Sequence, residues 1–119
     1  TLRGGTICSA DDLSNFANLT GLHTLVIDLD GLSSLHGLEN LTGLTELDLN
    51  CRSSSIADLS PLANMENLVT LRLYAGSGPA INVDALGGLE NLRIVEIGPA
   101  GRIGDTSALA HVPEVLLRN

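Results

Sequence analysis

A leucine-rich phrase recurs along this chain at intervals of 22 to 24 residues. LTGLHTLVIDL begins at Leu19, LTGLTELDL begins at Leu41, and weaker copies begin at Met65 and Leu89. Each copy places apolar residues at positions 1, 4, 7 and 9 of its unit, and again at about positions 14, 17 and 20, except that the fourth has Thr106 at position 17. Stacked units of this kind bury one continuous core, so self-similarity at such a period indicates a repeat architecture. The repeat therefore limits the fold to a solenoid.

The repeat covers nearly all of the 119 residues, which are few enough for a single domain. We expect four full repeats flanked by partial ones: 1–18, 19–40, 41–64, 65–88, 89–111 and 112–119. The start of the first unit is missing or irregular. Terminal repeats need polar caps, because otherwise their apolar side is bare. We therefore expect a segment of a larger protein, and end-to-end self-association is a second way to cover the ends.

Each unit combines two periods. Positions 7 and 9 alternate as in a short strand with one buried face, whereas positions 14, 17 and 20 are spaced by three, as in a 3₁₀ turn or short helix. Position 18 holds a helix-capping residue in most units, including Ser60, Asp84 and Ser107. Pro61 follows at the first helical position, where proline fits well. We predict a strand, a turn and a short helix in each unit, with caps at position 18.

This pattern resembles the leucine-rich-repeat family, LxxLxLxx(N/C)xL. The stretch IADLSPL at 56–62 is most similar to the IxDLSPL ending of the 22-residue, internalin-type class. The resemblance implies an α/β fold, a right-handed solenoid with a parallel sheet on its concave face and short helical or 3₁₀ segments on its convex face. Family members carry an Asn ladder at position 12, but here that position holds other residues: Asp30, Arg52, Gly76 and Ala100. We expect less regular turns in the Gly-rich loops at 75–82 and 98–105.

Strand positions 6, 8 and 10 should point onto the concave face, because side chains alternate along a strand. The candidates for partner contact are the charged residues and the single tyrosine at these positions: Asp28, Glu46, Asp48, Arg72, Tyr74 and Glu96. Arg and Tyr are enriched among interface hot spots. We predict a non-enzymatic recognition module for a protein or peptide with basic groups. The alternative is a structural or autoinhibitory spacer of a larger sensor or surface protein, in which this face is only solvated.

Charge narrows the choice of partner. Six basic against fourteen acidic residues give a formal charge of −8, which is the wrong sign for a nucleic-acid surface and favours basic partners.

No apolar run approaches the roughly 20 residues of a membrane span. The sequence has no GxxxxGK[ST] phosphate-binding motif, and we expect no cofactor. The resemblance implies either a bacterial surface protein or an intracellular sensor, and the sequence does not choose between them.

Catalytic and metal-binding interpretations are weaker. Carboxylates on an open face lack the burial that separates the pKa values of paired catalytic acids. Asp28 and Asp48, expected about 5 Å apart on neighbouring strands, supply too few oxygens for calcium. Cys8, expected at position 12, and Cys51 belong to turns two units apart, so a disulfide is out of reach. No histidine is placed to activate either cysteine, and we expect neither an active site nor a metal site.

Overall fold

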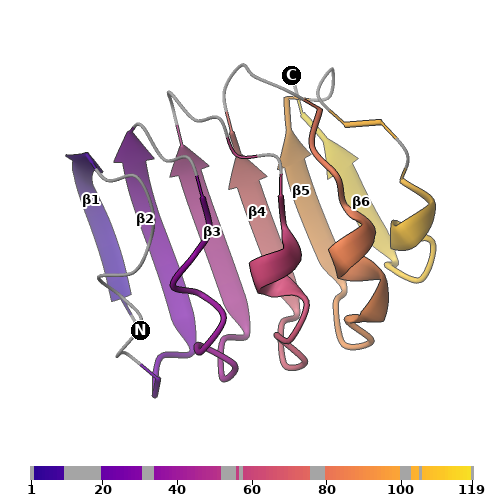
Figure 1. Ribbon diagram of the computed structural model, residues 1–119, viewed down its shortest axis with the longest axis horizontal. Helices are drawn as coiled ribbons and strands as arrows, with labels where there is room; N and C mark the ends of the chain where they lie inside the picture. The colour runs from indigo at the N-terminus through magenta and orange to yellow at the C-terminus, as the bar shows by residue number, and fades with distance from the viewer. Residues whose placement is uncertain are drawn as a thin grey trace.

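The computed structural model describes residues 2–9, 20–30, 34–51, 56, 58–75, 80–99, 103–104 and 106–118, with only the backbone described at 2–9, 29–30 and 51. Within this part of the chain, one sheet of six parallel strands runs in sequence order (Figure 1). The strands are β1 (Leu2–Ser9), β2 (Thr24–Asp30), β3 (Glu46–Cys51), β4 (Thr70–Tyr74), β5 (Ile94–Gly98) and β6 (Glu114–Leu117).

Short 3₁₀ helices follow three of the strands and lie over one face of the sheet (Figure 1). They are η2 (Ser60–Leu62), η3 (Asp84–Gly88) and η5 (Ser107–Leu109). This face is the convex side of the solenoid, and the opposite, uncovered face of the sheet is the concave side. The predicted leucine-rich-repeat architecture is confirmed, with 3₁₀ turns where the sequence left 3₁₀ or α-helix open.

The core lies between the sheet and these helices. Leu25, Leu47, Leu71 and Val95 follow one another in register across β2 to β5, and each is 0% exposed. Fully burying one such side chain stabilises the fold by about 2 kcal/mol. Because the units are stacked, each buried leucine lies beside its counterparts in the neighbouring units. Aliphatic side chains can therefore form a continuous core, although the whole sequence has only one Phe and one Tyr.

The capping residues are not the ones that we predicted at position 18. Ser60, Asp84 and Ser107 are the first residues of η2, η3 and η5, and the N-cap residue before each makes no side-chain cap hydrogen bond. The side chain at position 16, which is Asp58 in one unit and Asn82 in the next, accepts the hydrogen bond that closes the turn instead. The Ser60 N–H donates to Oδ1 of Asp58 at 2.9 Å, and the Asp84 N–H donates to Oδ1 of Asn82 at 2.8 Å. These are Asx turns, in which the side chain replaces a backbone acceptor.

The same contact occurs in the first full unit, where the His36 N–H donates to Oγ of Ser34 at 3.0 Å. Position 16 thus closes the turn in three successive units. The hydrogen bond from the Ser60 N–H holds the pKa of the Asp58 carboxyl below its ordinary value. Pro61 is the second residue of η2 rather than the first, so it still lies in the turn where its missing N–H costs no hydrogen bond.

The start of the first unit, which we predicted to be missing or irregular, is present as strand β1 and is irregular. Its register with β2 shifts between Gly4 and Cys8. Cys8 then pairs with Leu29, and Cys51 pairs with Leu29 from the other side. The two cysteines therefore lie in strands, not in turns, although they remain two strand spacings apart. Cys8 is level with Leu29 rather than Asp30, so it does not occupy position 12.

A ladder of amide side chains joins successive turns on the edge where the strands begin. Nδ2 of Asn67 donates to the Thr42 carbonyl at 3.2 Å, and Nδ2 of Asn91 donates to the Glu66 carbonyl at 2.8 Å. Both asparagines are at position 3 of their units, and each reaches the preceding unit. The predicted departures at position 12 (Arg52, Gly76, Ala100 and the Asp30 side chain), and half of each Gly-rich loop, lie outside the described residues.

Candidate functional site

The concave face presents two rows of side chains that cross the strands at right angles. The position-8 row runs through residues that pair in register: Val26, Asp48, Arg72, Glu96 and Leu116. The position-10 row runs parallel to it and consists of Asp28, Asn50, Tyr74, Gly98 and Arg118. Together with Glu46 at position 6 of β3, these rows contain all six residues that the sequence singled out.

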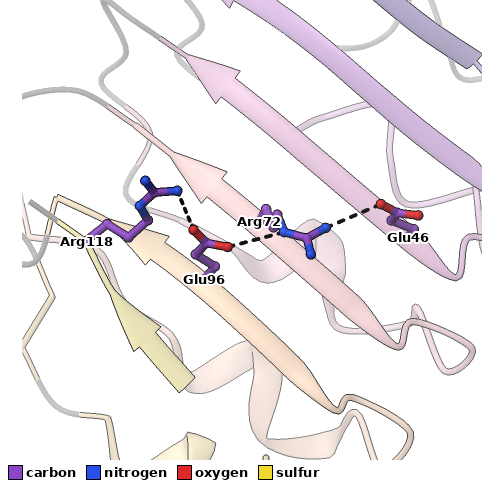
Figure 2. Close-up of polar contacts among 4 residues, drawn as sticks. All are labelled: Glu46, Arg72, Glu96 and Arg118. Carbon is purple, nitrogen blue, oxygen red and sulfur yellow. Dashed lines mark hydrogen bonds and ion pairs between the residues drawn. The ribbon is translucent and has the colours of Figure 1, made fainter. Parts of the chain in front are cut away.

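A chain of ion pairs crosses this face (Figure 2). Nη1 of Arg72 lies 3.4 Å from Oε2 of Glu46, and Nε of Arg72 lies 3.2 Å from Oε2 of Glu96. The other oxygen of Glu96 accepts from Nη1 of Arg118. We call these four residues the ion-pair chain. It contains two carboxylates and two guanidinium groups, so its formal charge is zero.

Asp48 differs from the other carboxylates of the face. It lies directly opposite Arg72 in the register of β3 and β4, yet no ion pair of the described residues includes it. Burial raises the pKa of the Asp48 carboxyl above its ordinary value. The charge of Arg72 opposes that shift, and the carboxylates of Glu46, Glu96 and Asp28 add to it. Asp48 is therefore a half-buried negative charge without full compensation.

A hollow of about 300 Å³ opens on the concave face around these groups. Its walls come from β3, β4, β5 and the residue after β6: Asp48, Leu49, Asn50, Arg72, Leu73, Tyr74, Glu96 and Arg118. Tyr74 is 40% exposed, so the ring offers an aromatic surface beside charged groups. A larger hollow of about 410 Å³ lies at the edge where the strands begin, but the asparagine amides that line it already donate to backbone carbonyls, so the smaller hollow is the better candidate.

Sequence reasoning missed Arg118, which closes one end of the ion-pair chain. The expected unit at 112–119 puts Arg118 at position 7, on the buried face. The structure instead pairs Val115 with Val95 at position 7, so the last unit reaches its strand three residues earlier and Arg118 takes position 10. The same phase explains Leu116, which is 48% exposed at position 8 of the face, whereas Leu117 at position 9 is 44% exposed on the edge strand. Of the four candidate carboxylates, only Glu46 and Glu96 form ion pairs with Arg72.

Comparison with known proteins places this fold. No protein-family model matches the chain, and no curated protein does either. Among solved structures it is similar to internalin C2 from Listeria monocytogenes, with 28% identity, a TM-score of 0.70 and coverage of 89% of this chain and 46% of that one. It is also similar to an internalin (inlF) of the same organism, with 25% identity, a TM-score of 0.73 and coverage of 90% and 31%. The chain therefore has a leucine-rich-repeat fold of the internalin type. It spans less than half the length of each of these two internalins.

The described carboxylates of this internalin-type domain do not form a cation cage. Among the described residues, no group of three or more His, Cys, Asp or Glu side chains is placed to hold a metal ion. Asp28 pairs with Asn50 and Asp48 pairs with Val26, so the two aspartates are diagonal neighbours. The expected separation of about 5 Å required them to lie directly opposite each other, which they do not. In the same part of the chain, no helix is long and apolar enough to cross a membrane.

The histidines of the domain have structural contacts. Nδ1 of His23 lies 3.0 Å from the Gly43 carbonyl oxygen, and Nε2 of His111 lies 3.0 Å from that of Leu89. Nδ1 of His36 contacts Oε2 of Glu39 at 2.9 Å. The Cys8 and Cys51 side chains lie outside the described residues, so the expectation that neither is a nucleophile stays a prediction.

Proposed function

We propose that this internalin-type domain is a non-enzymatic recognition module that binds a protein or peptide through its concave face. The fold supports this proposal, because a solenoid of parallel strands holds its concave side chains on a rigid surface. The partner carries basic groups. Asp48, Glu46, Asp28 and Glu96 contribute the negative charge of the face, Tyr74 contributes apolar area, and Arg72 holds two of the carboxylates in place.

The observation that carries the proposal is the position of Asp48. Its carboxylate lines the hollow, is partly desolvated, and belongs to no ion pair of the described residues. A lysine or arginine of a partner would supply the missing counter-charge, and charge-assisted hydrogen bonds are stronger than neutral ones. Tyr74 lines the same hollow, and a cation held against an aromatic face gains about 0.5–1 kcal/mol at an exposed site.

The test is a capture experiment from an extract of the source cells with three forms of the chain. The first is the wild type, and the second combines Asp48→Lys, Arg72→Glu and Tyr74→Ala. The matched control combines Glu66→Lys, Arg93→Glu and Val69→Ala, which alters the same charges at exposed positions off the concave face. Circular dichroism verifies that all three are folded. A protein retained by the wild type and the control but lost from the concave-face variant supports the proposal.

Two other results would contradict it. Equal capture by all three forms would move binding to another surface. Capture by none would favour the alternative, a structural or autoinhibitory spacer that packs against other parts of a larger protein. In that case, replacements at Arg72 and Tyr74 should have no effect on function, whereas changes around Leu116 should.

A further inference from the structure

We propose that the concave face distinguishes the two ends of its partner by charge. An extended segment crosses the strands along the position-10 row, with a basic side chain over Asp28 and Asp48 and an acidic side chain at Arg118. This inference rests on the proposed function and deepens it, because it adds an acidic group to the partner and sets the separation between the two charges.

The position-10 row has a charge at each end and neutral residues between. Asp28 on β2 begins the row, and Asn50, Tyr74 and Gly98 follow in register. Arg118 ends it, since its N–H donates to the Ile97 carbonyl at 2.9 Å beside Gly98. The row therefore carries a negative charge at its β2 end and a positive charge at its other end, on the residue that follows β6.

At the negative end, two carboxylates are available to a partner. Asp28 and Asp48 belong to neighbouring strands, both are half-buried, and neither takes part in an ion pair of the described residues. Two carboxylates of like charge that lie close together favour a cation between them. A lysine or arginine side chain fits this end.

At the positive end, Arg118 retains hydrogen-bond donors that no described side chain occupies. One nitrogen, Nη1, donates to Glu96, and the side chain is 66% exposed. A guanidinium carries five N–H donors in a planar fork, so the remaining donors can bind a second carboxylate from outside. Glu96 is only 17% exposed, and it fixes the guanidinium without covering it. An aspartate or glutamate side chain fits this end.

The middle of the row has room for the backbone and an apolar side chain. Gly98 places no side chain between Tyr74 and Arg118, and the hollow of about 300 Å³ is lined from Asn50 to Arg118. Tyr74, at the centre of the row, offers the aromatic surface against which an apolar residue can pack.

Strand geometry sets the charge separation that the partner needs. The row spans four strand intervals, from β2 to the residue after β6, or roughly 19 Å at the usual spacing between neighbouring strands. An extended peptide advances about 3.3 Å per residue. The basic and acidic residues of the partner should therefore lie about six positions apart.

The test begins with selection of random 12-residue displayed peptides on the 119-residue chain. We expect the retained peptides to combine one basic and one acidic residue about six positions apart, with an apolar residue between. Retention of basic peptides without a spaced acidic residue would overturn this inference and leave the proposed function standing. Absence of any enrichment over an uncoated surface would overturn both.

A binding comparison then assigns each end. Arg118→Gln should weaken a retained peptide about threefold, and it should have no effect on the same peptide with its acidic residue changed to glutamine. Asp28→Asn should likewise weaken the retained peptide about threefold, and it should have no effect on the same peptide with its basic residue changed to methionine. The controls are Arg93→Gln and Asp84→Asn, which change the same charges at exposed positions outside the row. An equal effect of Arg118→Gln on both peptides, or an equal effect of Arg93→Gln, would contradict the inference.

Discussion

Arg72 lies directly opposite Asp48 across β3 and β4, but no ion pair of the described residues joins the two side chains. The guanidinium instead contacts Glu46, two residues before Asp48, and Glu96 on the next strand. Glu96 lies directly opposite Arg72 across β4 and β5. Glu46 is a diagonal neighbour, and because a glutamate is one methylene longer than an aspartate, its carboxylate still reaches the guanidinium. The consequence is an ion-pair chain of zero formal charge beside an aspartate that remains negative.

Replacement of Arg72 by methionine should destabilise the fold modestly. Methionine keeps an unbranched apolar stem, so the change removes the charge and leaves most of the packing. Glu46, Glu96 and Asp48 would then repel one another. Ion pairs at half-exposed sites are weak, so we expect a loss of about 1 kcal/mol in the free energy of unfolding at low salt, and less at high salt. Urea denaturation at two salt concentrations measures this loss.

A double-mutant cycle with Glu96→Gln separates the contact from other effects of the replacement. If Arg72 and Glu96 stabilise each other, the two losses will not add. Additive losses, or a loss that grows with salt concentration, would contradict the importance of this ion pair. Glu90→Gln, at an exposed position off the concave face, is the charge-matched control.

Asp48 should destabilise the folded chain at neutral pH. Burial raises the pKa of its carboxyl in the folded state above the ordinary value of 3.8, so the folded chain binds this proton more tightly than the unfolded chain. The stability linked to Asp48 is therefore complete below the unfolded pKa and is lost as the pH rises through the folded pKa. Asp48→Asn should raise the Tm at about pH 7, and the difference from wild type should vanish near pH 3.

Thermal unfolding across this pH range, followed by circular dichroism, checks the prediction. Asp84→Asn is the control, since it removes one negative charge from an exposed position on η3. The pKa argument fails if Asp48→Asn lowers the Tm at neutral pH, or if Asp84→Asn raises the Tm as much as Asp48→Asn does.

The fold was predictable because its signal repeats. Leu71 and Leu73 face the core while Thr70, Arg72 and Tyr74 face outward, and the same alternation recurs in each unit, so one ambiguous residue cannot obscure the period. The phase of the repeat therefore placed all six candidate residues on one face without any structural information.

The contacts within that face were not predictable in the same way. The repeat period puts Asp48 and Glu96 on either side of Arg72 in the same row. Arg72 forms ion pairs with Glu96 and with the diagonal neighbour Glu46 instead of Asp48, and the period does not determine that choice. The capping residue was ambiguous for a related reason. Asp58 and Ser60 are both good capping types, and only the backbone geometry shows that Asp58 accepts from the Ser60 N–H.

The position-16 turns should respond to pH according to whether the acceptor is charged. The Ser60 N–H lowers the pKa of Asp58, so the stability from this contact is present above the unfolded pKa of 3.8 and is lost as the pH falls through the folded pKa. Asp58→Ala should therefore lower the Tm at neutral pH and have little effect in acid. Asn82→Ala should cost about 1 kcal/mol at both pH values, because an amide does not titrate.

Thermal unfolding of the two alanine variants at about pH 7 and about pH 2 makes the comparison. Asp58→Asn serves as the control, since it keeps an oxygen acceptor and removes the charge. A pH-independent effect of Asp58→Ala, or a pH-dependent effect of Asn82→Ala, would show that the Asx turns do not stabilise the fold in the way described.

Gly98 is required by the close approach of the backbone that follows β6. A Cβ at this buried position would lie 2.6 Å from the Arg118 carbonyl oxygen, and because that atom belongs to the backbone the strand itself would have to move. We expect Gly98→Ala to destabilise the fold by about 1–3 kcal/mol, the usual cost of overpacking, and to separate Arg118 from Glu96. Gly88→Ala is the matched control, since a Cβ there meets nothing within 4 Å. Urea denaturation gives the two free energies. If Arg118→Gln costs as much in the Gly98→Ala background as in the wild type, the Arg118–Glu96 contact does not depend on this glycine.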